Sequence, residues 1–271
     1  MNANYNNSKL KFYIGDIRDK HSLDAAMIDV DYVFHAAAMK QVPACEQYPL
    51  EALKTNVLGS TNVLESAIEH KVKKIVCLST DKAVYPTSTM GLTKSLMEKI
   101  ALQKSKEQNT TQICITRFCN LIASNGSVVP LFINQIKNNK PISITDPTMT
   151  RFFMSIQEAI DLVYYAFTSG TNGEIIVKYC HPCEIKALAQ GVCEYMDKTT
   201  YPITIIGGRP GEKKHEMLIT NEEYNNALLV NNDYIIINDV TKNNIPFYIK
   251  SNEMPMMTSN ELKQLLLTVQ K

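Results

Sequence analysis

STDKAVYPTSTMGLTK, residues 79–94, joins the end of an apolar run to the start of a helical pattern. The run that leads into it, KIVCLST (74–80), is short and rich in β-branched residues, which predicts a buried strand. The pattern that follows, MGLTKSLMEKIALQKSK (90–106), predicts a helix on which Met90 and Lys94, four residues apart, share one face. A buried strand that runs into a helix is the unit from which parallel sheets covered by helices are built.

The same unit recurs on both sides of this stretch. Further strands are predicted at KFYIGD (11–16), YVFHAAA (32–38), QICITRF (112–118) and GEIIVKY (173–179), and further helices at 22–29 and 49–70. This regular alternation predicts an α/β protein with a doubly wound, Rossmann-type parallel sheet. Such sheets bind ligands beyond the carboxyl ends of their strands, which is where Thr80 lies.

After about residue 125 the alternation becomes less regular. Three S/T-x-x-E capping boxes predict that helices begin at Ser155, Thr220 and Thr258. We therefore expect two parts. They are a Rossmann domain of residues 8–125 and 173–195, and a smaller mixed lobe for the substrate of residues 126–172 and 196–271.

Composition limits the classes of function. The 28 basic and 27 acidic residues nearly cancel, so neither nucleic acid nor an anionic membrane is expected as a partner, and small ligands remain. No apolar run reaches the length of about 18 residues that a membrane span requires, and residues 1–10 lack the apolar core of a signal peptide. We expect a cytoplasmic protein. Seven cysteines, an odd number, argue against a disulfide framework and predict reduced thiols.

Seven motifs, taken in order, resemble those of a known family. They are GDIRD (15–19), YVFHAAAMKQVP (32–43), KTNVLGSTNV (54–63), STDKAVYP (79–86), RFCNLIASNGSVVPLF (117–132), ITDPTMTRFFM (144–154) and RPGEKKHE (209–216). Together they are similar to the nucleotide-sugar 4,6-dehydratases, which are extended short-chain dehydrogenase/reductases. Within these, the chain resembles the UDP-N-acetylglucosamine 4,6-dehydratases of capsule and other polysaccharide biosynthesis, from about residue 9 to the C-terminus.

The resemblance implies a reaction in three steps. Such enzymes oxidise the sugar at C4 by passing a hydride to NADP or NAD, eliminate water across C5 and C6, and return the hydride to C6. Asp81 would then protonate the leaving hydroxyl, Lys82 would remove the C5 proton, and Thr80 would hydrogen-bond O4. Because a base must be neutral part of the time, we expect burial and the nearby Lys94 to lower the pKa of Lys82 from about 10.4. Taken alone, the pair also fits a strand end at which Asp81 caps a turn and Lys82 is solvated.

Met90 stands four residues before Lys94, where short-chain dehydrogenases usually have a tyrosine. A thioether has no ionisable proton, so Met90 cannot deprotonate the C4 hydroxyl. The sequence here resembles a sub-branch of these dehydratases that also carries methionine and inverts C5. We expect Lys82, or a water that it orients, to act at O4. The alternative is that Met90 is a packing residue in a site that has lost activity.

The resemblance also implies the binding residues. For the cofactor they are Asp16 and Ile17 beside the adenine, the wall His35, Ala36 and Ala37, the ribose-binding Lys94, and Asn120. For the substrate they are Lys40, Asn120, Val128, Arg151, Arg209 and Glu212. An arginine fork suits phosphate oxygens, and a carboxylate suits neighbouring hydroxyls. At Asn125 the sequence departs from the arginine that this branch tends to have.

No metal site is expected. CHPC (180–183) is a lone C-x-x-C without a second pair, and His215 is expected to pack or to be solvated.

A dinucleotide fold should open with a strand, a glycine-rich turn and a helix, and no G-x-x-G-x-x-G occurs in this sequence. Because KFYIGD resembles the third strand of the family, we expect a sheet that lacks its first strands, has hydrophobic edges and binds the cofactor weakly. The chain is then a fragment of a longer enzyme, or a short form that binds a nucleotide sugar without redox chemistry.

Two other functions stay open. One is a UDP-sugar 4-epimerase, although epimerases of this superfamily normally need the tyrosine and lack the Asp-Lys pair. The other is a non-catalytic protein that binds nucleotide sugars. In every case we expect UDP-N-acetylglucosamine or a related UDP-sugar as ligand and, for a full-length enzyme, a homo-oligomer such as a dimer or hexamer.

Overall fold

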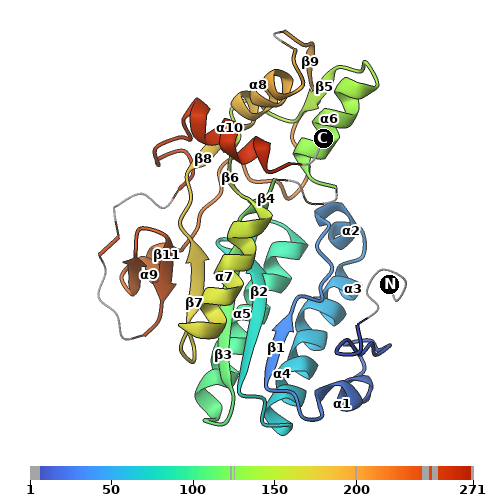
Figure 1. Ribbon diagram of the computed structural model, residues 1–271, viewed down its shortest axis with the longest axis vertical. Coiled ribbons are helices and arrows are strands. Elements are labelled where there is room, and N and C mark those ends of the chain that lie inside the picture. Colours follow the sequence, from blue (N-terminus) through green and yellow to red (C-terminus); the bar gives the residue numbers. More distant parts are fainter. Residues whose placement is uncertain are drawn as a thin grey trace.

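A six-stranded sheet forms the centre of the computed structural model, which describes residues 7–122, 124, 126–198, 200–239, 244–245 and 250–269. Its strands lie in the order β1 (Tyr32–His35), β2 (Lys74–Thr80), β3 (Gln112–Phe118), β7 (Ile175–Lys178), β11 (Tyr234–Ile237) and β10 (Ala227–Val230). The first four are parallel, whereas β11 and β10 pair antiparallel. The protein therefore has the predicted Rossmann-like α/β fold (Figure 1).

Helices cover both faces of this sheet (Figure 1). Lys74 of β2 donates to the carbonyl of Phe167 in α7 (Ile156–Thr168) at 2.8 Å. Ser79 of β2 donates instead to Glu98 of α5 (Thr89–Glu107). Because successive side chains of a strand point to opposite faces, α7 and α5 lie on opposite sides of the sheet. Beside α5 packs α4 (Ser60–Glu69).

Residues 11–16 do not form the predicted strand. They are exposed and irregular, and no strand within the described ranges runs beside them to pair with their backbone. β1 therefore forms the edge of the sheet, where Tyr32 is 58% and Phe34 47% exposed. This edge is hydrophobic, as the sequence predicts.

The predicted helix at 49–70 is interrupted. It consists of α3 (Pro49–Leu53), the π-helical turn η1 (Lys54–Gly59) and α4. Asn56, in the π-helical turn, bonds both the N–H and the carbonyl of Met39, and its amide also donates to Thr93 Oγ1 of α5. A π-helical turn is common beside functional sites, and this one ties the loop after β1 to α5. Two short helices flank β1 along the chain: α1 (His21–Met27) comes before it and α2 (Val42–Gln47) after it.

Buried apolar side chains form one hydrophobic cluster around the main sheet. A second hydrophobic cluster lies above the carboxyl ends of the parallel strands in the view of Figure 1. Its helices are α6 (Val128–Lys137), α8 (Ile185–Tyr195) and α10 (Ser259–Leu267). Two small sheets accompany them, β5 (Ile142–Ile144) with β9 (Ile203–Ile205), and β4 (Asn120–Leu121) with β6 (Thr150–Met154) and β8 (Pro182–Glu184).

All three predicted capping boxes are present. Ser155, Thr220 and Thr258 each accept a hydrogen bond from the backbone of the glutamate three residues later, and that glutamate bonds back to the backbone N–H of the cap. They open α7, α9 (Asn221–Tyr224) and α10. Two backbone N–H groups at each helix start are thereby satisfied, which is why this local signal could be read from the sequence.

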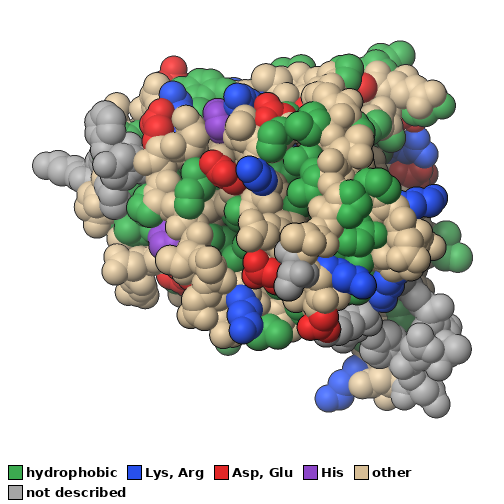
Figure 2. All heavy atoms as spheres, turned by 90° about the horizontal axis from the view of Figure 1, so that it is seen from above, with side chains coloured by type: hydrophobic (Ala, Val, Ile, Leu, Met, Phe, Trp, Pro, Cys, Tyr) green, Lys and Arg blue, Asp and Glu red, His purple; other side chains and the backbone are tan. Residues whose placement is uncertain are grey.

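The division into two lobes stays a proposal. Two segments are found in the other part of the structure from the one to which the predicted boundaries assign them. Residues 227–237 complete the main sheet as β10 and β11, and α8 packs within the second cluster. Among the described helices, none has both the length and the apolar character needed to cross a membrane. On the end of the molecule shown in Figure 2, acidic, basic and apolar side chains are interspersed.

Candidate active site

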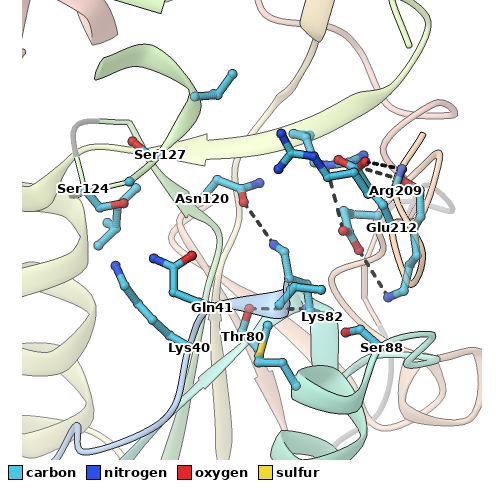
Figure 3. A pocket seen from close by; sticks show the side chains of 18 of the residues that line it. Lys40, Gln41, Thr80, Lys82, Ser88, Asn120, Ser124, Ser127, Arg209 and Glu212 are labelled. Carbon is cyan, nitrogen blue, oxygen red and sulfur yellow. Dashed lines mark hydrogen bonds and ion pairs between the residues drawn. The ribbon is translucent and has the colours of Figure 1, made fainter. Parts of the chain in front are cut away.

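A cavity of about 530 Å³ opens where β2 and β3 end, and its lining comes from both hydrophobic clusters. This volume lies in the usual range for small-ligand sites. Most of the predicted site residues line it: Ala36, Lys40, Thr80, Lys82, Met90, Lys94, Asn120, Val128, Arg151, Arg209 and Glu212. Figure 3 shows Lys40, Lys82 and Asn120 pointing into one space, with Arg209 and Glu212 across from Lys40.

Asp81 and Lys82 lie directly after the carboxyl end of β2. The strand ends at Thr80, and the next residues form the 3₁₀ turn η2 (Asp81–Ala83), which aims Lys82 into the cavity and places Asp81 beneath it. Lys82 Nζ lies 3.0 Å from Asp81 Oδ1, and the Thr80 hydroxyl donates to the same oxygen at 2.9 Å. Asp81 is 1% exposed, and its Oδ2 has no hydrogen-bond partner in the described part of the chain. A buried carboxylate thus shares a hydrogen-bonded proton with an amine that reaches the cavity.

Asn120 holds the other side of Lys82. Its Oδ1 accepts from Lys82 Nζ at 3.0 Å, while its Nδ2 donates to the carbonyl of Phe152 at 3.0 Å. Because Asn120 lies in β4 and Phe152 in β6, two paired strands of a small sheet hold this side of the amine.

The expected lowering of the Lys82 pKa is wrong. Burial lowers the pKa of Lys82, but the negative charges of Asp81 and Glu216 and the hydrogen bond to Asp81 outweigh it and raise the pKa above its ordinary value. Lys82 is therefore an ammonium group at neutral pH in this arrangement. The sequence could not show this because Glu216 is far away along the chain.

The lysine with the lowered pKa is Lys94. It is 5% exposed, and its Nζ donates to the carbonyl of Leu78 at 2.8 Å. Burial lowers the pKa of Lys94 to about 8, against smaller opposing contributions from Cys77 and Glu98. Met90 lies one helical turn earlier, 5% exposed, and contacts the cavity with its thioether side chain.

The loop of residues 209–216 forms the wall opposite Lys40. Arg151 of β6 holds it: its guanidinium donates to the carbonyls of Lys213 at 2.7 Å and Lys214 at 3.1 Å, and meets Glu212 Oε1 at 3.4 Å. Most donors of Arg151 are thus bonded to this loop. The side chain of Arg209 is exposed at the rim, and its backbone N–H donates to Glu212 Oε2.

The charge of the lining is strongly asymmetric. Six basic and two acidic side chains are found there: Lys40, Lys82, Lys94, Arg151, Arg209 and Lys213 against Glu212 and Glu216. Such a lining attracts an anionic ligand, and low-dielectric walls strengthen the attraction.

Four predicted cofactor residues do not line the cavity. Asp16 is exposed and pairs with Arg18 at 2.6 Å, which lowers the pKa of Asp16 to about 2. Ile17 packs against Gly59, where an added Cβ would lie 2.8 Å from it. His35 is buried against Ser60 Oγ at 2.8 Å, and burial together with the charge of Lys94 lowers the pKa of His35 to about 4. Ala37 is exposed.

Sequence reasoning missed several lining residues: Gln41, Ser88, Ser124, Ser127, Lys213 and Glu216. Lys213 and Glu216 lie inside the RPGEKKHE motif and could have been found there. Ser88 caps α5 by accepting from the N–H of Gly91, a signal that the apolar start of the helix obscured. Asn125, where the sequence departs from the family, lies outside the described residues.

The residues predicted to bind the cofactor are divided between the cavity and other parts of the structure. Ala36, Lys94 and Asn120 line the cavity, whereas Asp16 and Ile17, expected beside the adenine, and His35 and Ala37 of the expected wall do not. The Rossmann glycine-rich turn is absent from the sequence, so no pyrophosphate cradle of that kind can be assigned.

The C-x-x-C motif does not bring its two cysteines together. Cys180 faces Cys119, with Sγ atoms 3.1 Å apart, whereas Cys183 packs in the second cluster. All seven cysteines are free and buried. No group of three or more potential metal ligands occurs in the ranges that the structure describes.

Known proteins are similar to this chain in sequence and in structure. A family profile described as "Polysaccharide biosynthesis protein" matches residues 1–238. A protein of Rickettsia conorii (strain ATCC VR-613 / Malish 7) named "UDP-glucose 4-epimerase" is 47% identical over 284 residues, which cover 99% of this chain and 83% of the relative.

Two solved structures are also similar. The X-ray structure of Pen from Bacillus thuringiensis has a TM-score of 0.91 and 35% identity, over 99% of this chain and 84% of that one. DesIV, a dTDP-glucose 4,6-dehydratase from Streptomyces venezuelae with NAD and TYD bound, has a TM-score of 0.71 and 21% identity, over 77% and 70%. At that identity the second likeness concerns the fold alone.

Proposed function

The chain belongs to the polysaccharide biosynthesis protein family, and from that premise we propose that it is a nucleotide-sugar 4,6-dehydratase that prefers UDP-N-acetylglucosamine. The broader class, an enzyme of the short-chain dehydrogenase/reductase type that modifies a nucleotide sugar, is supported by the family match and the fold. The narrower activity is supported by the site.

The observation that carries the proposal is the hydrogen bond between Lys82 Nζ and Asp81 Oδ1 at 3.0 Å. Elimination of water needs a base for the C5 proton and an acid for the C6 hydroxyl at the same time. In the ion-paired form neither residue can play its part. Transfer of one proton along this hydrogen bond gives a neutral amine and a protonated carboxyl, which are the base and the acid required.

Binding of substrate favours this transfer. A sugar that fills the cavity removes water from Lys82, whose side chain is 24% exposed, and loss of water disfavours separated charges. Asn120 Oδ1 then holds the amine in place, and the Thr80 hydroxyl stays within 2.9 Å of Asp81 for a bond to the sugar oxygen. A bound nicotinamide cofactor would supply the hydride acceptor and donor; Lys94 and Asn120 are the residues placed to hold its nicotinamide half.

The diphosphate of the substrate suits the basic lining. Lys40 and Arg209 lie at the rim and Lys213 deeper, while the guanidinium of Arg151 is largely committed to the loop. Lys213 Nζ is itself paired with Glu216 and bonded to the carbonyl of Val84. We therefore assign diphosphate binding chiefly to Lys40 and Arg209, with Val128, at the start of α6, in the same lining.

A 4-epimerase is the second candidate, because the Rickettsia conorii relative carries that name. An epimerase needs a base at the C4 hydroxyl and no acid at C6. With Met90 in place of the tyrosine, α5 lacks the usual base, and Lys82, an amine that lines the cavity, would have to act instead. A non-catalytic nucleotide-sugar-binding protein is the third candidate.

Mass spectrometry after incubation with UDP-N-acetylglucosamine and excess NAD or NADP separates the three. A dehydratase releases one water and gives a 4-keto-6-deoxy product. An epimerase gives an isomer of unchanged mass, which chromatography resolves from the substrate. Binding without either product favours the non-catalytic protein.

We expect Lys82→Met to abolish dehydration, with a loss of at least about 10²-fold because the variant has no base. Lys99→Met, which changes an exposed lysine of α5, serves as the control. Turnover that survives in Lys82→Met would refute the assignment of the base.

A further inference from the structure

Glu216 is a buried carboxylate in the cavity wall that no part of the proposed reaction uses. It is 2% exposed. Its Oε2 lies 3.2 Å from Lys213 Nζ but makes no hydrogen bond within the described residues, and its Oε1 lies 3.9 Å from Arg151 Nε. A carboxylate with such loose pairing is costly to bury unless its charge acts on something else nearby.

The structure holds this carboxylate in position through its backbone. The N–H of Glu216 donates to Ser251 Oγ at 2.9 Å, and its carbonyl accepts from the N–H of Ser251 at 2.9 Å. Ser251 Oγ also contacts Thr150 Oγ1, whose other partner is His215 Nδ1. The backbone at Glu216 is thus tied through Ser251 to Thr150 of β6.

Glu216 and Lys82 line the same cavity. Burial and the charge of Arg151 lower the pKa of Lys82, whereas the negative charges of Asp81 and Glu216 raise it. Lys213 faces Glu216 from the same loop, and its Nζ also donates to the carbonyl of Val84 at 2.6 Å, next to the turn that carries Lys82. The loop and the catalytic turn are therefore one connected unit.

We propose that Glu216 is a positioning residue whose buried carboxylate holds Lys82 in the ammonium form and so controls when Lys82 can accept a proton. Asp81 accepts one hydrogen bond from Lys82, and Glu216 adds a second negative charge that keeps the proton on nitrogen. The part of the inference that concerns catalysis rests on the proposed function. The protonation of Lys82 itself does not.

The test measures the protonation of Lys82 without any turnover. Acetic anhydride acetylates only neutral amines, so the rate at which the Lys82 peptide is acetylated at several pH values, followed by mass spectrometry, reports its pKa. The exposed Lys99 in the same sample is the internal reference. In Glu216→Gln we expect the pKa of Lys82 to fall because a nearby negative charge is lost, so that acetylation below the pKa is about tenfold faster.

Two variants complete the design. Glu222→Gln removes the same charge at an exposed position of α9 and should leave the Lys82 rate unchanged. Glu216→Asp keeps the charge and should restore most of the original rate. Equal acetylation rates of Lys82 in Glu216→Gln and Glu222→Gln would overturn the proposal.

If circular dichroism shows that Glu216→Gln does not fold, Lys213→Met decides. Removal of this cation leaves the charge of Glu216 less compensated, so acetylation of Lys82 should become slower; an unchanged or faster rate overturns the proposal. If the acetylation rate of Lys82 changes in the variants but the wild-type protein shows no dehydration, the proposed function is contradicted and the role of Glu216 is not.

Discussion

Lys94 is a buried lysine whose proton is weakly held. Its Nζ has the carbonyl of Leu78 as hydrogen-bond partner, and burial lowers its pKa to about 8. An unfolded chain restores the ordinary lysine pKa of about 10.4. Between these two values the unfolded state binds the proton and the folded state does not, so the stability contributed by this residue rises with pH.

We expect this to appear as a pH-dependent difference between the wild type and Lys94→Met. From pH 7 to 9.5 the free energy of unfolding of the wild type should gain about 2 kcal/mol on the variant, at about 1.4 kcal/mol per unit above the folded pKa. Urea unfolding at the two pH values measures it. Lys99→Met, exposed on the same helix, should show a constant difference from the wild type. A constant difference for Lys94→Met as well would contradict the lowered pKa.

At the scale of elements, the turn after β2 packs directly on the first turn of α5. An added Cβ at Gly91 would lie 2.4 Å from the carbonyl oxygen of Lys82 and 3.1 Å from Pro86 Cβ. The carbonyl belongs to the backbone of η2, so it cannot move without moving the Asp81–Lys82 pair. Gly91 therefore sets the distance between helix and turn.

We expect Gly91→Ala to disturb the site although alanine favours a helix by about 1 kcal/mol. The displaced turn should lengthen the Lys82–Asp81 hydrogen bond, which lowers dehydration at least about tenfold and speeds acetylation of Lys82. Gly191→Ala in α8 is the matched control, because its Cβ would meet the flexible ends of Leu262 and Leu266. Equal activity in the two variants would show that the contact is relieved without moving the turn.

Local signals in the sequence predicted elements well, and signals that depend on distant partners did not. The capping boxes at Ser155, Thr220 and Thr258 involve only neighbouring residues, and all three are present. Strand formation at 11–16 depends on a neighbouring strand, which the described residues do not provide. The raised pKa of Lys82 depends on Glu216, which only folding brings into the same cavity.

At the scale of the whole molecule, a buried ion network joins three elements. Arg117 of β3, 2% exposed, bonds Glu98 of α5 at 2.9 and 2.7 Å and Glu223 of α9 at 2.9 and 2.6 Å. Ser79, the residue before Thr80, donates to Glu98 as well. The network thus connects α9 to β2, the strand that leads into the η2 turn with Asp81 and Lys82.

Removal of Arg117 should be among the most destabilising single changes. Arg117→Met leaves two carboxylates buried without their cation, and we expect a loss of about 3–5 kcal/mol, or roughly 10 °C in Tm. Replacement of all three charges, as in Arg117→Met with Glu98→Gln and Glu223→Gln, should recover part of it. Differential scanning calorimetry on both variants checks this, and a loss below about 1 kcal/mol for the single change would contradict it.

Cofactor binding depends on which half of a dinucleotide the fold can hold. Under the proposed assignment, Ala36, Lys94 and Asn120, which line the cavity, would hold the nicotinamide half. The residues expected at the adenine half lie outside it, and Asp16 is already paired with Arg18. A chain that contacts one half gains little from the other, so we expect NADPH to bind with a Kd of about 1 mM, near −4 kcal/mol.

A fluorescence titration that compares NADPH with reduced nicotinamide mononucleotide tests this prediction. Because the contacts lie at the nicotinamide end, the two should bind within about threefold of each other, a difference below about 1 kcal/mol. Lys94→Met should weaken both ligands, whereas Lys99→Met should affect neither. NADPH binding that is tenfold or more tighter than that of the mononucleotide would mean that this chain holds the adenosine phosphates through residues other than Asp16 and Ile17.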